Sequence, residues 1–160
     1  MTMQTDDRDG SPSSHPILSC TDGLAASAQD TLLLIGRVLL GAVFVTSGWR
    51  KLLDIPGFAA TMGGRGGLPE WLGYVAPPVE FIGGIALVLG LGTRYAALVM
   101  LLFVIIATFS SHAYWTYPAA QQAAQFVQFG KNTSMMGGLV LLFLVAGGRF
   151  SLDELLRRKT

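Results

Sequence analysis

LVMLLFVII, residues 98–106, is the stretch that decides the fold of this chain. Every residue in it is apolar, so it lacks the alternation of polar and apolar residues that the strands of a membrane barrel show. The interior of a bilayer offers no water to unpaired backbone groups, and a continuous apolar segment therefore crosses it as a helix. We predict an all-α protein built from membrane-spanning helices.

The composition of the whole chain also indicates a membrane protein. Of its 160 residues, 51% are hydrophobic and 13% are charged, whereas about 25% are charged in an ordinary soluble domain. The formal net charge is +1 and no basic stripe lies away from the membrane flanks, which argues against nucleic-acid binding. Cys20 is the only cysteine, which excludes a thiol oxidoreductase that works through its own cysteine pair.

Four apolar segments are long enough to span a bilayer, which takes about 20 helical residues. They cover residues 31–49, 72–91, 95–113 and 132–148. Consecutive spans run in opposite directions, so we predict an integral membrane antiparallel four-helix bundle that occupies residues 31–149. The short connection Gly92–Arg94 makes the second and third helices direct neighbours.

The segments outside the spans are polar or rich in glycine. Residues 1–30 hold several aspartates against one basic residue and are predicted to be a disordered acidic tail. Residues 50–70 contain four glycines around Arg65 and predict a flexible loop, and residues 114–130 predict a segment that lies on the bilayer surface. In residues 150–160, Ser151 followed by Glu154 forms a capping box, which predicts a short amphipathic basic helix.

The basic and aromatic residues at the span ends predict the orientation. Four spans put both termini on one side of the membrane, and slightly more basic residues flank the spans on that side than on the other. The positive-inside rule therefore favours cytoplasmic termini. Trp49, Trp71 and Trp115 all fall at span ends on the opposite side, where they predict an aromatic belt.

Polar or ionisable residues lie at or inside every span. A charge at the bilayer centre costs at least about 2.5 kcal/mol, so such residues usually face a bundle interior, a cavity or each other. The alternating spans bring most of them to the side opposite the termini. Lys131 and Asn132 can also serve only as anchors at the start of the fourth span. The candidate site residues are Arg37, Lys51, Glu80, His112, Lys131 and Asn132.

Arg37 has two interpretations. It lies near the start of the first span, so its side chain can extend back to the membrane surface on the side of the termini. Alternatively, it shares a helical stripe with Gly41, Phe44, Gly48 and Lys51, and a polar stripe that contains glycine should face other helices. In the second interpretation Arg37 belongs to the polar cluster.

Glu80 and His112 are the candidates for proton chemistry. Glu80 follows Pro77-Pro78 and is either a residue of the first helical turn or a buried carboxylate that pairs with Arg37 or Lys51 or accepts a proton. His112 is the only histidine in a span, which argues against a bis-histidine haem. We expect it in a hydrogen-bonded polar cluster, and no metal site is predicted.

Several short motifs occur in a fixed order along the chain. They are Gly36-Arg37-Val38-Leu39-Leu40-Gly41, Ser47-Gly48-Trp49-Arg50-Lys51-Leu52, Val79-Glu80, Gly83-Gly84, His112, Phe129-Gly130-Lys131-Asn132 and Gly137-Gly138. Together they resemble the DoxX family of small four-helix bacterial membrane proteins, over roughly residues 32–148. The resemblance implies a multi-pass protein of the bacterial cytoplasmic membrane. Some relatives are subunits of a thiosulfate:quinone oxidoreductase or membrane partners of sulfur and oxidative-stress enzymes.

Our leading hypothesis is a redox-associated membrane subunit whose polar cluster binds a quinone headgroup or a small anion. Arg37 and Lys51 would attract negative charge, Glu80 and His112 would exchange protons, and Asn132 would donate a hydrogen bond. We expect no covalently bound cofactor. Electrons would come from a soluble or membrane redox partner protein.

Two other functions fit the same residues. In one, the cluster is an interhelical ion-pair network, and the protein is a scaffold that docks a soluble enzyme through its C-terminal helix and tail. In the other, the ionisable residues mark the pathway of a solute or proton carrier, although four spans show no inverted repeat that would build alternating access. The sequence leaves a homo-oligomer open.

Overall fold

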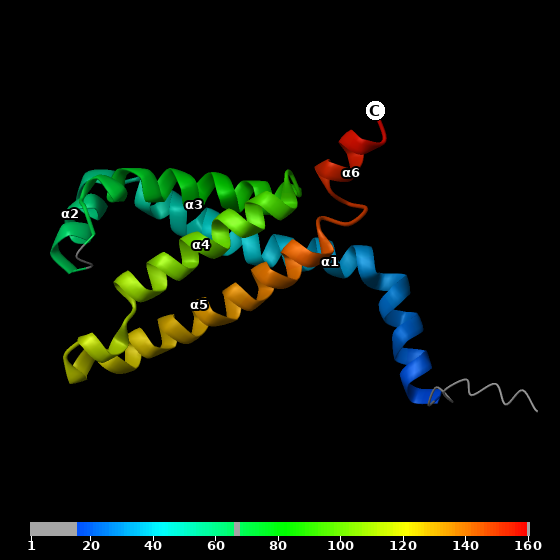
Figure 1. Cartoon of the computed structure of the whole chain (residues 1–160), viewed down its shortest axis with the longest axis horizontal. Coiled ribbons are helices and arrows are strands. Elements are labelled where there is room, and N and C mark those ends of the chain that lie inside the picture. Colours follow the sequence, from blue (N-terminus) through cyan, green and yellow to red (C-terminus); the bar gives the residue numbers. More distant parts are fainter. Residues whose placement is uncertain (1–15, 66–67, 160) are drawn as a thin grey trace, which may run out of the picture.

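A computed structural model describes residues 16–65 and 68–159 of the chain, and every regular element within them is a helix (Figure 1). The elements are α1 (Pro16–Leu52), α2 (Ile55–Arg65), α3 (Trp71–Leu89), α4 (Thr93–Ser111), the 3-10 turn η1 (Tyr114–Thr116), α5 (Ala119–Val145) and α6 (Leu152–Arg157). The predicted all-α membrane helical bundle is confirmed.

Three helical segments among the described residues are long and apolar enough to cross a membrane. They are Ala25–Leu52, Trp71–Leu89 and Thr93–Thr116, which correspond to the first three predicted spans. The fourth predicted span, residues 132–148, is the apolar half of α5, and its helix ends at Val145. The other half of α5 is rich in glutamine. The mean hydropathy of α5 therefore stays below the level that would mark it by itself as a membrane span.

The first helix begins earlier than predicted. Residues 16–30 were predicted to be disordered, but α1 starts at Pro16, and its N-terminal part, blue in Figure 1, runs outward from the bundle. Ala25, Ala26 and Ala28 are strong helix formers, a preference that the reasoning from charge did not weigh. Residues 1–15 of the predicted tail lie outside the described residues.

The segment predicted as a flexible loop before the second span also contains a helix. Helix α2 packs against the first turns of α3, where Gly73 leaves no room for a side chain beside the backbone of Ala59. Helix α3 then runs without interruption through Pro77 and Pro78 to Leu89. Glu80 consequently lies near the middle of α3, and its placement in a first turn was wrong.

Helices α1 and α3 pack most closely, through glycines. A Cβ atom on Gly84 would lie 2.8 Å from the backbone nitrogen of Val45, and one on Gly48 would lie 2.7 Å from that of Phe81. Small residues of this kind let membrane helices approach closely. Within the predicted stripe from Arg37 to Lys51, Gly41, Phe44 and Gly48 are buried, so the stripe faces other helices as expected.

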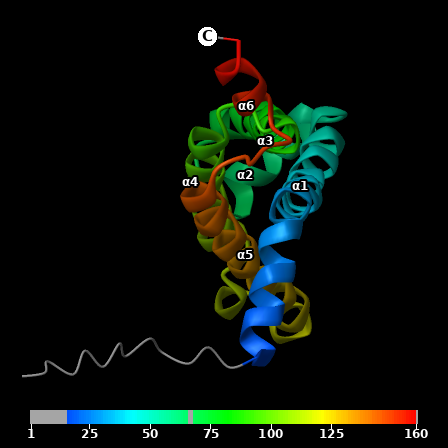
Figure 2. The same cartoon turned by 90° about the vertical axis from the view of Figure 1, so that its right-hand side faces the viewer.

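The helices form two units, which are joined near the α6 end of the molecule and lie farther apart at the other end. The α1–α3 unit consists of α1, α2 and α3, and the α4–α5 unit consists of α4, η1 and α5. The turn Gly90–Gly92 joins α3 to α4, and from this turn the two helices diverge (Figure 1), while α5 runs back along α4. Figure 2 shows α1 and α4 on opposite sides of the molecule. The apolar core between the units includes Phe44, Leu87, Met100 and Leu139.

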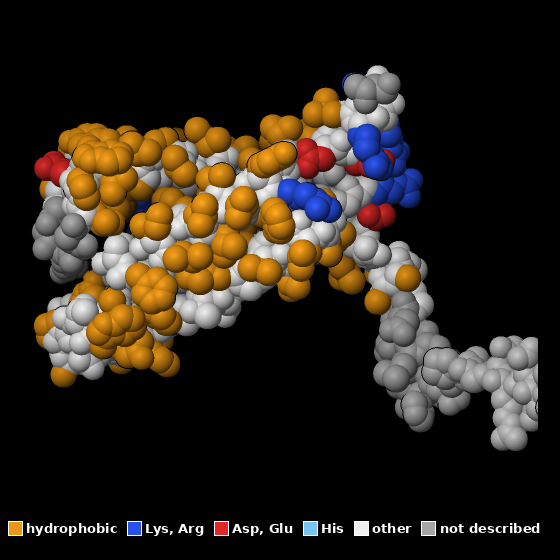
Figure 3. Space-filling view, viewed as in Figure 1, with side chains coloured by type: hydrophobic (Ala, Val, Ile, Leu, Met, Phe, Trp, Pro, Cys, Tyr) orange, Lys and Arg blue, Asp and Glu red, His pale blue; other side chains and the backbone are white. Residues whose placement is uncertain are grey.

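The outer surface matches a membrane setting. Hydrophobic side chains cover most of the face shown in Figure 3, and charged side chains gather at the end that carries α6. Both α6 and the start of the apolar part of α1 lie at this end, as a bundle with an even number of long antiparallel helices requires. Trp49, Trp71 and Trp115 are more than half exposed.

Candidate functional site

Arg37 lies at the end of the bundle that carries α6. Its side chain is buried, with 1% of the residue exposed, and its guanidinium donates hydrogen bonds to the carbonyl oxygens of Gly147 at 2.9 Å and Phe150 at 2.7 Å. Its membership of a cluster with Lys51 and Glu80 was therefore wrong. The alternative, a side chain that extends back toward the terminal side, is the arrangement observed, and two backbone carbonyls beyond α5 hold it there.

Asp153 completes the same contact region from α6. Its carboxylate accepts hydrogen bonds from the backbone nitrogens of Gly92 at 2.6 Å and Thr93 at 2.8 Å, and from the Thr93 hydroxyl at 2.8 Å. It thus caps the first turn of α4 from outside the helix. Burial of the carboxylate acts to raise its pKa, but the hydrogen bonds from Thr93 and Gly92 and the charge of Arg37 together hold the pKa of Asp153 below its ordinary value.

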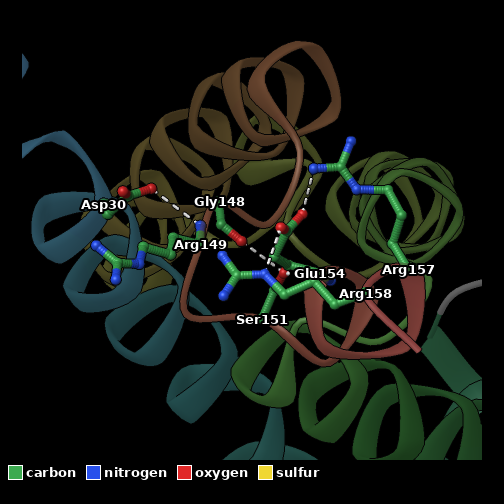
Figure 4. Close-up of polar contacts among 7 residues, drawn as sticks. All are labelled: Asp30, Gly148, Arg149, Ser151, Glu154, Arg157 and Arg158. Carbon is green, nitrogen blue, oxygen red and sulfur yellow. Dashed lines mark hydrogen bonds and ion pairs between the residues drawn. The ribbon is translucent and has the colours of Figure 1, made fainter.

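The turn before α6 is fixed by further polar contacts, drawn in Figure 4. Asp30 of α1 accepts a hydrogen bond from the backbone nitrogen of Arg149 at 2.9 Å. The Ser151 hydroxyl donates to the carbonyl of Gly148 at 2.6 Å and accepts from the backbone nitrogen of Glu154 at 3.2 Å, which confirms the predicted N-cap. We call Arg37, Asp30, Thr93 and the segment Gly147–Asp153 the C-terminal clasp.

Glu154 also serves α6 through its neighbours on the same helix. Its carboxylate forms ion pairs with Arg157 at 2.5 Å and Arg158 at 2.9 Å (Figure 4). Both contacts lower the pKa of Glu154, and the hydrogen bond from Arg158 has the larger effect. They lie on the surface of α6 and do not cross to another helix.

The opposite end of the bundle holds an ion pair between α1 and α3. Lys51 Nζ lies 2.5 Å from Glu80 Oε2, and the Glu80 residue is only 4% exposed. The same ammonium lies 5.1 Å from the centre of the Phe58 ring of α2. Of the two partners predicted for a buried Glu80, Lys51 is the one observed. The pair satisfies a carboxylate that would otherwise be costly near hydrocarbon.

A cavity of about 460 Å³ opens beside this ion pair, between the two units. Figure 3 shows the molecule hollowed between α3 and the start of α5, at the end away from α6. Its walls are mainly apolar and come from α2, α3 and α4. The polar residues that line it are Lys51, Thr61, Ser110, Ser111, His112, Tyr117 and Gln125.

His112 follows the last residue of α4 and lines the cavity. Its Nδ1 lies 2.8 Å from Gln125 Oε1 of α5, which fixes the ring, and the Tyr117 hydroxyl donates to the carbonyl of Ser111 at 2.7 Å. Tyr117 and Gln125 were missed at the level of sequence. Both belong to the segment predicted to lie on the membrane surface, and the position of Gln125 two helical turns before the candidate residue Asn132 was the available signal.

Lys131 and Asn132 do not line this cavity. Asn132 is buried and donates to the Thr108 hydroxyl at 3.0 Å, which joins α5 to α4. Lys131 is exposed, contacts Gln128 at 2.5 Å and lines a separate groove of about 870 Å³ between α1 and α5. The predicted binding cluster is therefore divided. Lys51 and His112 line the cavity, with Glu80 paired to Lys51, whereas Arg37 and Lys131 line the separate groove and Asn132 is buried between α5 and α4.

Comparison with known proteins gives a consistent family. The model of the family described as DoxX matches residues 32–113, and the model described as TQO small subunit DoxD matches residues 73–160. No solved structure matches the chain.

Two relatives are inner membrane proteins of Escherichia coli K12. YqjF is 30% identical over 82% of this chain and 96% of its own length, and YphA is 28% identical over 80% of this chain and 92% of its own length. The Surfeit locus protein 4 homolog of Drosophila melanogaster is 26% identical, over 79% of this chain and 41% of its own length. This chain has three apolar spans among its described residues. Together with the bacterial relatives, these spans indicate a multi-pass protein of the bacterial inner membrane. The chain belongs to the DoxX family.

Proposed function

We propose that this protein is a redox-associated membrane subunit whose cavity binds a quinone headgroup. The observation that carries the proposal is a cavity, apolar over most of its wall, that is lined by both Lys51 and His112. Sites for small organic ligands are typically of this kind and of several hundred Å³, with a few polar groups that orient the ligand.

The chemistry of the lining fits such a ligand. The Lys51 ammonium would donate to one quinone oxygen and stabilise negative charge on a reduced ring. Glu80 holds this ammonium at the cavity wall, and His112 would exchange a proton with the other oxygen. Arg37, Lys131 and Asn132, which were predicted to share in binding, are assigned no part in this site.

The family also supports a redox role. The DoxD model that matches residues 73–160 is named for the small subunit of TQO, a thiosulfate:quinone oxidoreductase. By analogy, electrons would pass between the quinone and a soluble or membrane partner protein.

Binding of a short-chain 1,4-benzoquinone to the purified protein in mild detergent tests the proposal. We expect saturable binding to the native protein and loss of at least tenfold in affinity in a Lys51→Met/Glu80→Gln variant, which removes both charges without stranding either. The matched control is Lys131→Met, which removes an exposed cation outside the cavity and should leave the affinity unchanged. Binding that persists when both Glu80 and His112 are replaced would overturn the proposal.

A scaffold is the second candidate function. The observation in its favour is the group of exposed cationic side chains at the α6 end of the molecule (Figure 3), namely Arg149, Arg157, Arg158 and Lys159. In this case Glu80→Gln and His112→Ala would reduce the thermal stability in detergent, and no activity of a co-purified complex would change separately. If these variants keep their stability but abolish the activity of the complex, the cavity is functional and the scaffold is rejected.

A further inference from the structure

The hydrogen bonds that connect the two units run through the segment after α5, at one end of the molecule. Within the described ranges 16–65 and 68–159, each of them involves the C-terminal clasp. Arg37 and Asp30 of α1 bind the turn after α5, and the α3–α4 turn binds α6 through Asp153. Asp153 also donates from its backbone nitrogen to the carbonyl of Gly90 at 3.0 Å.

At the cavity end, the polar side chains bond within their own unit. Lys51 pairs with Glu80 inside the α1–α3 unit. In the α4–α5 unit, His112 contacts Gln125, and Asn132 donates to Thr108. Among the described residues no hydrogen bond or ion pair crosses the cavity from one unit to the other.

The connection between the units is a short turn after α3, and Asp153 holds it at Gly90 and Gly92, so a change of angle at the cavity end would pivot there. Gly90 and Gly92 have φ values of +68° and +55°, a left-handed conformation that other residues seldom adopt. Gly90 ends α3 and Gly92 precedes α4, so the bend lies in the three-residue turn itself. Hinges of this type absorb a rotation in a few residues at the ends of rigid helices.

We propose that the ligand of the cavity bridges the two units, with one oxygen at Lys51 and a second at His112, and that its binding draws the units together. This inference rests on the proposed function and adds to it a closure of the two units. The ligand would be a ring with oxygen atoms on opposite edges, as in a 1,4-benzoquinone or its hydroquinone. A ring with one oxygen would engage only one unit.

The geometry of the His112 ring favours a bridging ligand. Its Nδ1 is held by Gln125, and no described residue hydrogen bonds to its Nε2. The ring and the Lys51 ammonium line the same cavity from different units. A ligand that contacts both the ring and the ammonium would connect the two units at the cavity end, where no hydrogen bond between described residues connects them.

The distance between two spin labels, one on each unit at the cavity end, measures the closure. Tyr74 of α3 and Gln121 of α5 are both exposed and can be replaced by cysteine in a full-length Cys20→Ser background. We expect a short-chain 1,4-benzoquinone to shorten and narrow the distance distribution. A control pair at Leu91 and Leu144, near the clasp, should not change.

A phenol that carries the same alkyl chain serves as the ligand with one oxygen. It should bind roughly tenfold more weakly, because about one hydrogen bond is lost, and should leave the distance between residues 74 and 121 unchanged. The His112→Phe variant keeps an aromatic ring but removes both ring nitrogens, and in it the quinone should likewise bind more weakly without closure.

The outcomes separate the two proposals. Quinone binding with an unchanged distance between residues 74 and 121, or closure by the phenol as well, overturns the bridging ligand and leaves the proposed function standing. Absence of any quinone binding overturns the proposed function and the bridging ligand with it.

Discussion

The two ends of this bundle contain similar polar residues that are used in different ways. At the C-terminal clasp, the charges of Arg37 and Asp153 are met by backbone groups, which are fixed in number and direction. At the cavity end, Lys51 and His112 are met by other side chains and line open volume. An ionisable residue in a membrane helix is therefore not by itself a sign of a binding site. Its partners decide whether it closes the fold or remains available to a ligand.

The physical reason lies in the termini of the helices. Every helix end leaves carbonyl or amide groups without intrahelical partners. At the clasp the bonded groups come from the end of α3, the start of α4 and the turn between α5 and α6. The side chains of Arg37 and Asp153 hydrogen bond to these groups, so both charges serve to stabilise the fold. At the cavity end the diverging units leave more space than their helix ends can fill.

The largest effect is expected from Arg37→Met. The substitution leaves the carbonyls of Gly147 and Phe150 without their donor in a buried position and should lower the free energy of unfolding by about 3 kcal/mol. Chemical unfolding in detergent, followed by circular dichroism, measures this. The control is Arg94→Met, an exposed arginine with one hydrogen bond to Leu144, for which about 0.5 kcal/mol or less is expected. Equal effects at the two positions would contradict the role of the clasp.

At the cavity end, Glu80→Ala is expected to cost somewhat less. It leaves the partly exposed Lys51 ammonium without its partner. We expect the free energy of unfolding to fall by about 2 kcal/mol, which is below the range for fully buried pairs. The Lys51→Met/Glu80→Gln variant should recover most of this loss, because no charge is left unpaired. Thermal unfolding in detergent compares the three proteins. If the double variant is as unstable as Glu80→Ala, the ion pair holds the fold and the scaffold hypothesis gains support.

Acid sensitivity should arise at the clasp through Asp153. Because its pKa is lowered in the folded protein, its contribution to stability is complete above the pKa of the unfolded chain and is lost as the pH falls through the folded value. Asp153→Asn should cost about 1 kcal/mol at neutral pH, as for a lost cap, and should flatten the fall in stability below about pH 4. Unfolding measured over a range of pH tests this. If the stability of Asp153→Asn falls with acid as steeply as that of the native protein, another carboxylate is responsible for the acid sensitivity.

The smallest effect is expected from Ser151→Ala. It removes the N-cap of α6 and should cost about 0.5 kcal/mol, because the helix is short and lies at the surface. Hydrogen exchange of the α6 amides should increase more than that of α4. Ser134→Ala, which removes an exposed hydroxyl bonded to its own helix, is the control with no expected change. Equal exchange in the two helices would mean that α6 unfolds only with the whole bundle.

Much of the fold could be predicted from the sequence. Apolar runs identified three spans, glycine spacing identified the face that α1 turns toward other helices, and Ser151 with Glu154 identified the start of the last helix. The boundaries were less predictable. Helix α5 joins a glutamine-rich half to an apolar half, and the reasoning from hydropathy divided it at Asn132, although nothing in the backbone interrupts it.

The site was predicted less well, for reasons of geometry. Arg37 reaches carbonyl groups that are 110 and 113 residues away in the chain, and no local pattern reveals such partners. Lys131 and Asn132 point about 100° apart because they are adjacent on a helix, so Asn132 reaches Thr108 of α4 while Lys131 is exposed. The pairing of Lys51 with Glu80 was accessible because each had few opposite charges within the membrane.

The central claim, that one end closes the fold and the other holds a ligand, is tested most directly by quinone affinity in two variants at conditions where both are folded. The account predicts that Arg37→Met, though less stable, binds a short-chain 1,4-benzoquinone with native affinity, while Lys51→Met/Glu80→Gln, though nearly as stable as the native protein, binds it at least tenfold more weakly. The reverse result, weakened binding in Arg37→Met and native affinity in the double variant, would contradict the account.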